Sequence, residues 1–317
     1  MPPRAERDVR TVGGMVRRHR VLPWVLLGAL AAAGADPAWA ATSPPTVTAD
    51  AAYWTAGRLD AAAPIGKGPE VATGSAARKA PAGTPQGRYI AGIPQVGTFF
   101  VASPDGNTSC TGSVVHSPGH NLVLTAGHCA YGWQRSTTHR IFVPAYVYGK
   151  DAAHQPYGFY PVERLVLDPR YRPSPATAAA TDLDFAFARL GAGQDRRRVE
   201  DVTHAFTLRT TPSYRNTVTV IGYPESRHNP GRRAITCTVP TTRLAGYRQM
   251  RMVCGGYYDG VSGSPWIAHY DAARHTGEVI GEVGGRGGGG DDQDDDWISY
   301  SPVYGSELVT LYRRAIK

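Results

Sequence analysis

The chain has 317 residues, with 34 Lys and Arg against 26 Asp and Glu, and a net charge of +8 at pH 7. The positive residues are scattered, and the arginine triplet at 196–198 forms their only run. This distribution lacks the basic stripe of a nucleic-acid-binding protein, so no nucleic-acid partner is expected.

The first 40 residues have the pattern of an export signal. Six arginines precede the 14-residue apolar stretch VLPWVLLGALAAAG (residues 21–34), and Ala38-Trp39-Ala40 follows it as a small-residue cleavage pattern. A membrane-spanning helix needs roughly 20 apolar residues. We therefore predict a signal peptide over residues 1–40 and a secreted, extracellular protein without stable membrane association. Its removal takes away six arginines and three acidic residues and leaves a net charge of +5.

Residues 41–93 are rich in Ala, Pro, Gly and Thr and contain few large apolar residues. Such a composition lacks the material for a hydrophobic core. We predict a propeptide or flexible lead-in here, and a second cut between about Ala80 and Pro94. Residues 94–317 are then sufficient for one two-lobed domain, expected to be a monomer.

From about residue 97, short β-branched and aromatic stretches alternate with Gly, Pro, Asn and Asp. Six stretches lie within about 97–195 and six within about 212–304, with almost no helical periodicity between them. This pattern predicts an all-β barrel or sandwich.

One helix is expected, at residues 306–316. Ser306 can cap its N-terminus, and Glu307 provides an acidic residue in the first turn. Its C-terminal end is basic, which suits the helix dipole, and carries Arg313, Arg314 and Lys317. Leu308, Leu311, Tyr312 and Ile316 share one face, which we expect to pack on the β core.

The four cysteines form two close pairs along the chain: Cys110 with Cys129, and Cys237 with Cys254. In an exported protein an even number of cysteines indicates disulfides, and three pairings are possible in principle. Closing each local pair makes a short loop that contributes roughly 3 kcal/mol. A zinc site is the alternative, but neither cysteine pair has Cys-x-x-Cys spacing or an accompanying His-x3-His. We predict the two local disulfides.

Three short stretches offer the groups that nucleophilic acyl transfer needs. His128 lies in LTAGHC, beside a cysteine that can fix its backbone. Asp184 precedes the alternating apolar stretch FAFARL, whereas Asp182 lies further into the loop. Ser262 lies in the turn GVSGSP, and Ser264 is interpreted as a supporting turn residue. A base, an orienting acid and a hydroxyl in the order His, Asp, Ser predict a catalytic triad.

The blocks LTAGHC, DFAFARL and GVSGSP resemble the three active-site blocks of chymotrypsin-fold (trypsin-like) serine peptidases. The likeness covers roughly residue 97 to the C-terminus and is nearest to secreted bacterial members of the glutamyl-endopeptidase-like branch. It implies two six-stranded antiparallel β-barrels with the active site between them. It also implies His128 as base, Asp184 as orienting acid and Ser262 as nucleophile, with the N–H groups of Gly260 and Ser262 as the oxyanion hole. Protein or peptide substrates and no cofactor are expected.

The sequence departs from the family pattern at the positions that set activation and specificity. Val261 stands before the nucleophile where trypsin-like enzymes have Asp, and Gly256 replaces trypsin's specificity acid. Glu282 and Val283 stand where glutamyl endopeptidases have a histidine. The candidate substrate-binding residues are Gly256, Glu282, Val283, Gly284 and Asp296. If Glu282 or Asp296 enters the pocket, Lys or Arg is favoured at the cleaved bond. We expect that neither does, because acids in glycine-rich surroundings usually stay in water, and therefore expect a preference for large aliphatic or aromatic residues.

Two stretches of the sequence could in principle bind a metal ion. The acidic run at residues 287–297 lacks the spacing of an EF-hand loop, so we expect a solvated loop without calcium. His116 and His120 are separated by Pro118, which argues against a helical metal pair. We therefore assign no metal site.

Two other functions are possible for such a chain. An α/β-hydrolase esterase needs Gly-x-Ser-x-Gly and the order Ser, Asp, His, which this chain lacks. An exported inactive homologue acting as a binding module remains the alternative function.

Overall fold

The computed structural model describes residues 45–66, 78–134, 137–174 and 176–317. These residues belong to one compact unit, Thr42–Lys317. The predicted signal peptide lies outside the described residues. Within the described ranges, no helix is long and apolar enough to cross a membrane.

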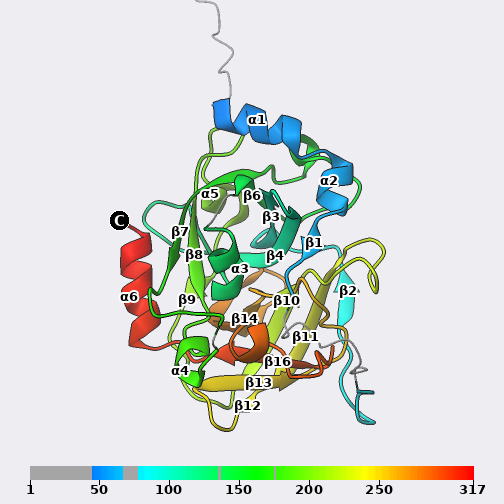
Figure 1. The fold of residues 1–317 in the computed structure, drawn as a ribbon, viewed down its shortest axis with the longest axis vertical. Coiled ribbons are helices and arrows are strands. Elements are labelled where there is room, and N and C mark those ends of the chain that lie inside the picture. Colours follow the sequence, from blue (N-terminus) through cyan, green and yellow to red (C-terminus); the bar gives the residue numbers. More distant parts are fainter. Residues whose placement is uncertain (1–44, 67–77, 135–136, 175) are drawn as a thin grey trace, which may run out of the picture. The chain divides into compact units, whose positions relative to one another are not determined.

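The first β system is a closed antiparallel barrel of six strands (Figure 1). The strands are β3 (Val96–Ser103), β4 (Gly106–Val115), β5 (Leu122–Thr125), β6 (Thr138–Pro144), β7 (Tyr160–Leu167) and β8 (Ala186–Leu190). They pair in the order β4, β3, β6, β7, β8 and β5, and β5 pairs with β4 to close the ring. The buried rings of Phe99 and Phe142 lie 4.8 Å apart in its interior. Apolar residues of the strands thus fill this core.

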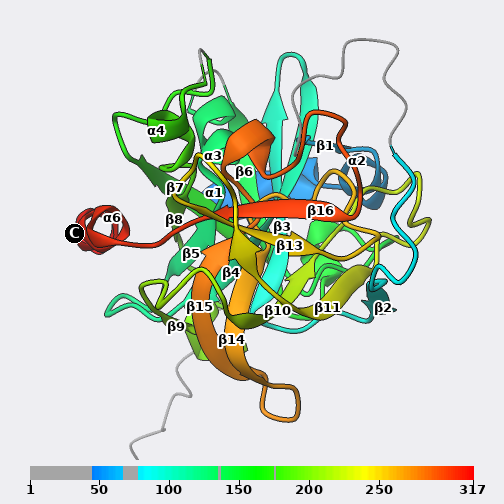
Figure 2. The ribbon, with the colours of Figure 1, turned by 90° about the horizontal axis from the view of Figure 1, so that it is seen from below.

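The second β system is built from two sheets. The six-stranded sheet has the order β2, β11, β10, β14, β15, β9, and the three-stranded sheet has the order β12, β13, β16. Their bounds are β2 (Arg88–Ile90), β9 (Thr207–Leu208), β10 (Thr217–Gly222), β11 (Ala234–Pro240), β12 (Thr242–Arg243), β13 (Gln249–Val253), β14 (Pro265–Asp271), β15 (Thr276–Glu282) and β16 (Ile298–Pro302). Figure 2 shows β16 running across the direction of β14 and β15. The predicted all-β fold is confirmed, with the second lobe formed by a six-stranded and a three-stranded sheet in place of a single six-stranded antiparallel barrel.

Both predicted disulfides are confirmed. Cys110 on β4 is bonded to Cys129, which lies in the short helix α3 (Gly127–Gly132). Cys237 on β11 is bonded to Cys254, directly after β13, and so joins the two sheets of the second lobe. Each bridge closes a loop of fewer than 20 residues, with sequence separations of 19 and 17.

In the stretch 41–93, predicted to be a propeptide or flexible lead-in, residues 45–66 are folded and do not form a flexible segment. Residues 45–66, here called the docked segment, form α1 (Pro45–Tyr53), α2 (Ala56–Asp60) and β1 (Ala63–Pro64). The helices lie at one end of the first barrel (Figure 1), and β1 pairs in parallel with β4. Trp54 and Leu59 are fully buried in the main hydrophobic core. The composition was misleading because two large side chains are sufficient to anchor a short segment.

The remaining helices connect the strands, and the last one differs in detail from the prediction. They are α4 (Ala178–Thr181), α5 (Val199–Thr203), the 3₁₀ turns η1 (Ala152–His154) and η2 (Arg286–Gly288), and α6 (Ser306–Ala315). In α6, Leu308 and Leu311 are buried as predicted. Ser306 is its first residue and Gly305 takes the cap position, so the predicted serine cap is wrong. Ile316 lies beyond the helix and is 39% exposed, so it does not pack on the core.

Candidate active site

His128 is the second residue of α3, which follows strand β5 of the first barrel. The preceding Gly127 has to be small, because a Cβ there would lie 2.9 Å from Oδ1 of Asp184. The absence of this Cβ lets the backbone N–H of His128 donate a hydrogen bond of 2.6 Å to the same oxygen. The helix start thus brings the imidazole directly against the carboxylate.

Asp184 orients the imidazole from a fully buried position just before β8. Its Oδ2 lies 2.9 Å and its Oδ1 3.2 Å from Nδ1 of His128. The backbone N–H of Gly285 donates a further hydrogen bond of 2.7 Å to Oδ2. These N–H groups satisfy a carboxylate that is shielded from water. The carboxylate in turn favours the tautomer in which Nδ1 of His128 carries the proton and donates to it.

Ser262 is held in a tight turn between the two lobes by main-chain hydrogen bonds. Its carbonyl oxygen accepts from the N–H of Thr111 on β4 at 2.9 Å, while the N–H of Gly263 donates to Val283 at 2.8 Å. A Cβ on Gly263, which has φ +84°, would lie 2.2 Å from the carbonyl oxygen of Thr111. Glycine is therefore required here, because the turn touches the first barrel.

The hydroxyl of Thr111 orders the residues around the candidate oxyanion hole. It donates to the carbonyl oxygen of Gly260 at 2.8 Å and accepts from the N–H of Tyr223 at 3.0 Å. Gly260 has φ +92°, a left-handed conformation that favours glycine. Among the described residues, no hydrogen-bond partner of the Ser262 N–H is found. That N–H is therefore available to an oxygen atom of a bound molecule.

The predicted triad would use Nε2 of His128 and Oγ of Ser262, and both atoms are buried. Within the described part of the chain, neither Nε2 of His128 nor Oγ of Ser262 has a hydrogen-bond partner. Unoccupied catalytic sites often hold such atoms slightly apart until substrate binds. Ser264 differs, because its Oγ donates to the carbonyl oxygen of Val261 at 2.5 Å. Ser264 therefore stabilises the turn, in agreement with its predicted role.

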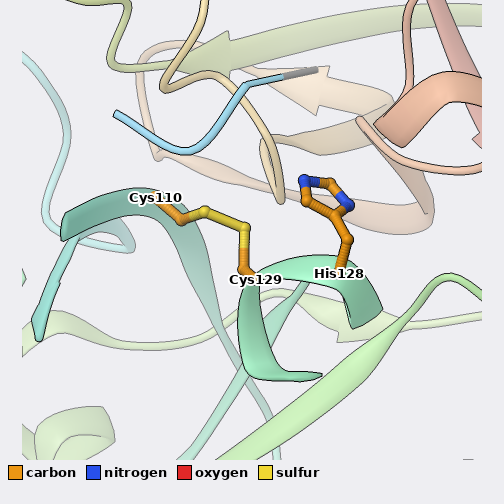
Figure 3. Close-up of side chains that lie close together, drawn as sticks. All are labelled: Cys110, His128 and Cys129. Atoms are coloured by element: carbon orange, nitrogen blue, oxygen red, sulfur yellow. A yellow bond between two sulfur atoms is a disulfide. The ribbon is translucent and has the colours of Figure 1, made fainter. Parts of the chain in front are cut away.

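The ring of His128 lies beside the disulfide between Cys110 and Cys129, as Figure 3 shows. Ligand atoms of these three residues lie within 4.8 Å of one another, a spacing that also suits a metal site. Metal-binding cysteines act as thiolates, whereas these two sulfur atoms are joined to each other. The cluster is therefore a structural support for His128.

A family model described as Trypsin matches residues 86–302. The chain belongs to the trypsin family. Its fold is that of solved serine proteases. A search of curated protein sequences gives no significant match. The first lobe, the second lobe and the turn of Ser262 between them all lie within the matched residues.

Three solved structures resemble this trypsin-family chain along nearly their whole length. The protease Anisep from Arthrobacter nicotinovorans matches with a TM-score of 0.61 and 21% identity, over 73% of this chain and 99% of its own. The thermostable serine protease AL20 from an extremophilic microorganism matches with a TM-score of 0.59 and 23% identity, over 71% and 98%. A Glu endopeptidase matches with a TM-score of 0.54 and 16% identity, over 74% and 98%. At these identities the likenesses establish the fold.

Three buried groups interact with Asp184: Glu282, which the sequence suggested only as a substrate-binding residue, and Tyr171 and Tyr304, which it did not single out. Glu282, at the end of β15, is fully buried, and among the described residues neither of its carboxylate oxygens has a partner. Burial, and then the neighbouring Asp184, raise the pKa of Glu282 well above its usual value. Burial and the same acidic neighbours raise the pKa of Tyr171 and Tyr304. Burial thus favours the protonated, neutral form of Glu282 beside Asp184.

The other candidate substrate-binding residues lie around the turn of Ser262. The N–H of Gly256 donates to Oδ2 of Asp296 at 2.7 Å. The N–H of Val283 donates to Ser264, and the N–H of Gly284 donates to Tyr300 at 3.1 Å. The structure therefore brings Gly256 and Asp296 together, whereas Glu282 is buried near Asp184.

The acidic run expected to be a solvated loop is instead anchored. Asp295 is fully buried and Asp291 nearly so. Both carboxylates bind Arg78, whose Nε lies 2.8 Å from Oδ2 of Asp295. Arg286 pairs with Asp292 at 2.5 Å. The expectation was wrong because the basic partner Arg78 lies more than 200 residues away in the sequence, beyond any local pattern.

Proposed function

We propose that this chain is a secreted serine endopeptidase that hydrolyses peptide bonds through an acyl-enzyme. Ser262 is the nucleophile, His128 is the general base, and Asp184 holds His128 in the required tautomer. The N–H groups of Gly260 and Ser262 stabilise the oxyanion of the tetrahedral intermediate.

The observation that carries the proposal is the contact between His128 and Asp184. With Nδ1 held 2.9 Å from the carboxylate, Nε2 is the unprotonated nitrogen and accepts the serine proton. It then returns this proton to the leaving amine, and water repeats the sequence to release the acyl group. Two disulfides in the fold agree with an oxidising, extracellular location.

The test is a comparison of Ser262→Ala with Ser264→Ala. Loss of the nucleophile lowers kcat by about a million-fold, whereas Ser264→Ala loses one hydrogen bond within the turn and retains most activity. A fluorophosphonate probe, followed by mass spectrometry, is expected to label Ser262 in the wild type. Near-normal turnover in Ser262→Ala would contradict the proposed mechanism, in which Ser262 is the nucleophile.

The rival function is an inactive homologue that binds a partner through the same face. It predicts that the probe labels neither the wild type nor Ser264→Ala. The complete set of His128, Asp184 and Ser262 supports the enzyme instead.

Specificity follows from where the acids lie. Oδ2 of Asp296 is held by the N–H of Gly256, and Glu282 is buried beside Asp184. We propose that the pocket is uncharged and selects large apolar residues at the cleaved bond. Sequencing the products from a mixed peptide library tests this. A strong preference for Lys or Arg would instead assign Asp296 to substrate recognition.

A further inference from the structure

The docked segment ends at the candidate oxyanion hole. The N–H of Ile65 donates to the carbonyl oxygen of Ser109 on β4 at 2.9 Å. The carbonyl oxygen of Ile65 accepts from the N–H of Gly260 at 3.4 Å. The next residue, Gly66, lies against Asp259, since its Cβ would lie 3.4 Å from Oδ1 of that residue. The main chain of Ile65 therefore bridges the first barrel and the turn that carries Ser262.

The carbonyl oxygen of Ile65 accepts from the N–H group that the oxyanion of a bound substrate would need. Under the proposed function, the N–H of Gly260 binds the oxyanion of the tetrahedral intermediate, and one N–H cannot fully serve two acceptors. Removing one such donor from a reacting oxygen costs about a hundredfold or more in rate. In Figure 3, a short stretch of blue chain lies above and to the left of the ring of His128. Pro64 also contacts Gly260, whose Cβ would lie 3.3 Å from Cβ of Pro64.

The segment is held in place by contacts far from the site. The buried guanidinium of Arg232 donates to the carbonyl oxygens of Leu59 at 2.7 Å and Ala62 at 3.0 Å, and to Oγ of Ser109 at 3.1 Å. Nε1 of Trp54 donates to the carbonyl oxygen of His139 at 2.7 Å. These anchors keep residues 63–66 at the site at an effective concentration that a diffusing peptide rarely reaches.

We infer that residues 63–66 are an intramolecular inhibitor of the proposed peptidase, with Ile65 occupying the oxyanion donor Gly260 and the main-chain acceptor Ser109. The inference rests on the proposed function and adds its regulation. The active enzyme is the form in which this segment has left Gly260. The segment is held by noncovalent contacts, which remain when the chain is cut elsewhere. Such a cut therefore activates the enzyme only if the segment also moves away from Gly260.

The test compares Ile65→Gly with Ile90→Gly in the full secreted chain. Both isoleucines are partly buried against the same core, but Ile90 lies on β2 and pairs with Ala234, away from Gly260. Ile65→Gly loses the apolar contact and loosens the main chain at the site. We expect kcat/KM for a peptide substrate to rise at least about tenfold in Ile65→Gly and to stay unchanged or fall in Ile90→Gly. Ile65→Pro, which removes the N–H to Ser109, is expected to act in the same direction.

The rate of Ser262 labelling by a fluorophosphonate separates two failures. Labelling in every variant, without faster turnover in the Ile65 variants, overturns the inference and leaves the proposed function standing. No labelling in any variant overturns both. If the Ile65 variants do not fold, hydrogen exchange of the Gly260 amide in the wild type tests whether this N–H is hydrogen-bonded to Ile65. Protection of at least about tenfold relative to an unstructured peptide supports the contact, and free exchange overturns it.

Discussion

One carboxylate holds both the main chain and the ring of the histidine: Asp184 accepts from the backbone N–H of His128 at 2.6 Å and lies 2.9 Å from its Nδ1. The position of the imidazole is thus coupled to the start of helix α3. Any change at Asp184 alters the tautomer and the placement of His128 together.

Asp184→Asn is expected to lower kcat on the order of ten-thousand-fold, because an amide favours the wrong imidazole tautomer. Asp182→Asn is the matched control. Asp182 accepts from the N–H of Arg248 at 3.1 Å and from Nε2 of Gln249 at 2.9 Å, so its change affects loop stability and leaves the chemistry intact. Steady-state kinetics on both variants check this, and equal losses would reassign the orienting acid.

The two disulfides are expected to differ in their effect on catalysis. Replacing either pair by alanine lowers the free energy of unfolding by roughly 3 kcal/mol, since the closed loops are similar. Only Cys110→Ala with Cys129→Ala also lowers kcat/KM, by roughly tenfold to a hundredfold, because Cys129 is adjacent to His128. Urea unfolding and kinetics below the unfolding transition measure the two effects. A comparable loss of turnover in the pair Cys237 and Cys254 would contradict the assignment.

Burial of Glu282 makes stability depend on pH. Its pKa is raised in the folded state, so the folded protein holds a proton that the unfolded chain releases. This stabilising contribution is complete below the unfolded pKa of about 4.3 and is lost as the pH rises toward the folded pKa. Glu282→Gln carries no titrating carboxyl, so its stability relative to the wild type is expected to increase from pH 4 to pH 8.

Urea unfolding at several pH values across that range measures the effect, with Glu163→Gln as the control. The side chain of Glu163 is 51% exposed and lies 4.0 Å from Arg189. A parallel shift in both variants, or no pH-dependent gain in Glu282→Gln, would mean that Glu282 is charged in the folded protein.

Arg232→Ala is expected to loosen the docked segment. The carbonyl oxygens of Leu59 and Ala62 lose their buried donor, which costs about 1–3 kcal/mol for each group left unsatisfied. Arg233→Ala is the control, because Arg233 is exposed and its guanidinium donates to the carbonyl oxygen of Tyr89 at 3.2 Å, outside the docked segment. Urea unfolding and limited proteolysis of residues 45–66 provide the measurement. Equal protease sensitivity in the two variants would show that Arg232 does not anchor the segment.

The local pattern of the sequence determined the fold class, both disulfides and the three candidate catalytic residues. Alternating apolar residues indicate strands without knowledge of their partners, because side chains in a strand have a period of two. Short spacings between cysteines favour local loops for reasons of chain entropy. His128, Asp184 and Ser262 are recognisable because each lies in a short stretch whose neighbours have to be small or apolar.

The tertiary structure alone decided what surrounds that site. Residues 45–66 contain few large apolar residues, yet they dock. Trp54 and Leu59 are buried, and Arg232, 173 residues after Leu59, supplies buried hydrogen bonds to carbonyl oxygens of this segment. Glu282 resembles any strand residue until burial deprives it of water and raises its pKa. The contact between Ile65 and Gly260 joins main-chain atoms, and main-chain hydrogen bonds leave no signal in residue identity. Desolvation and long-range pairing depend on which segments meet, and only the folded chain determines that.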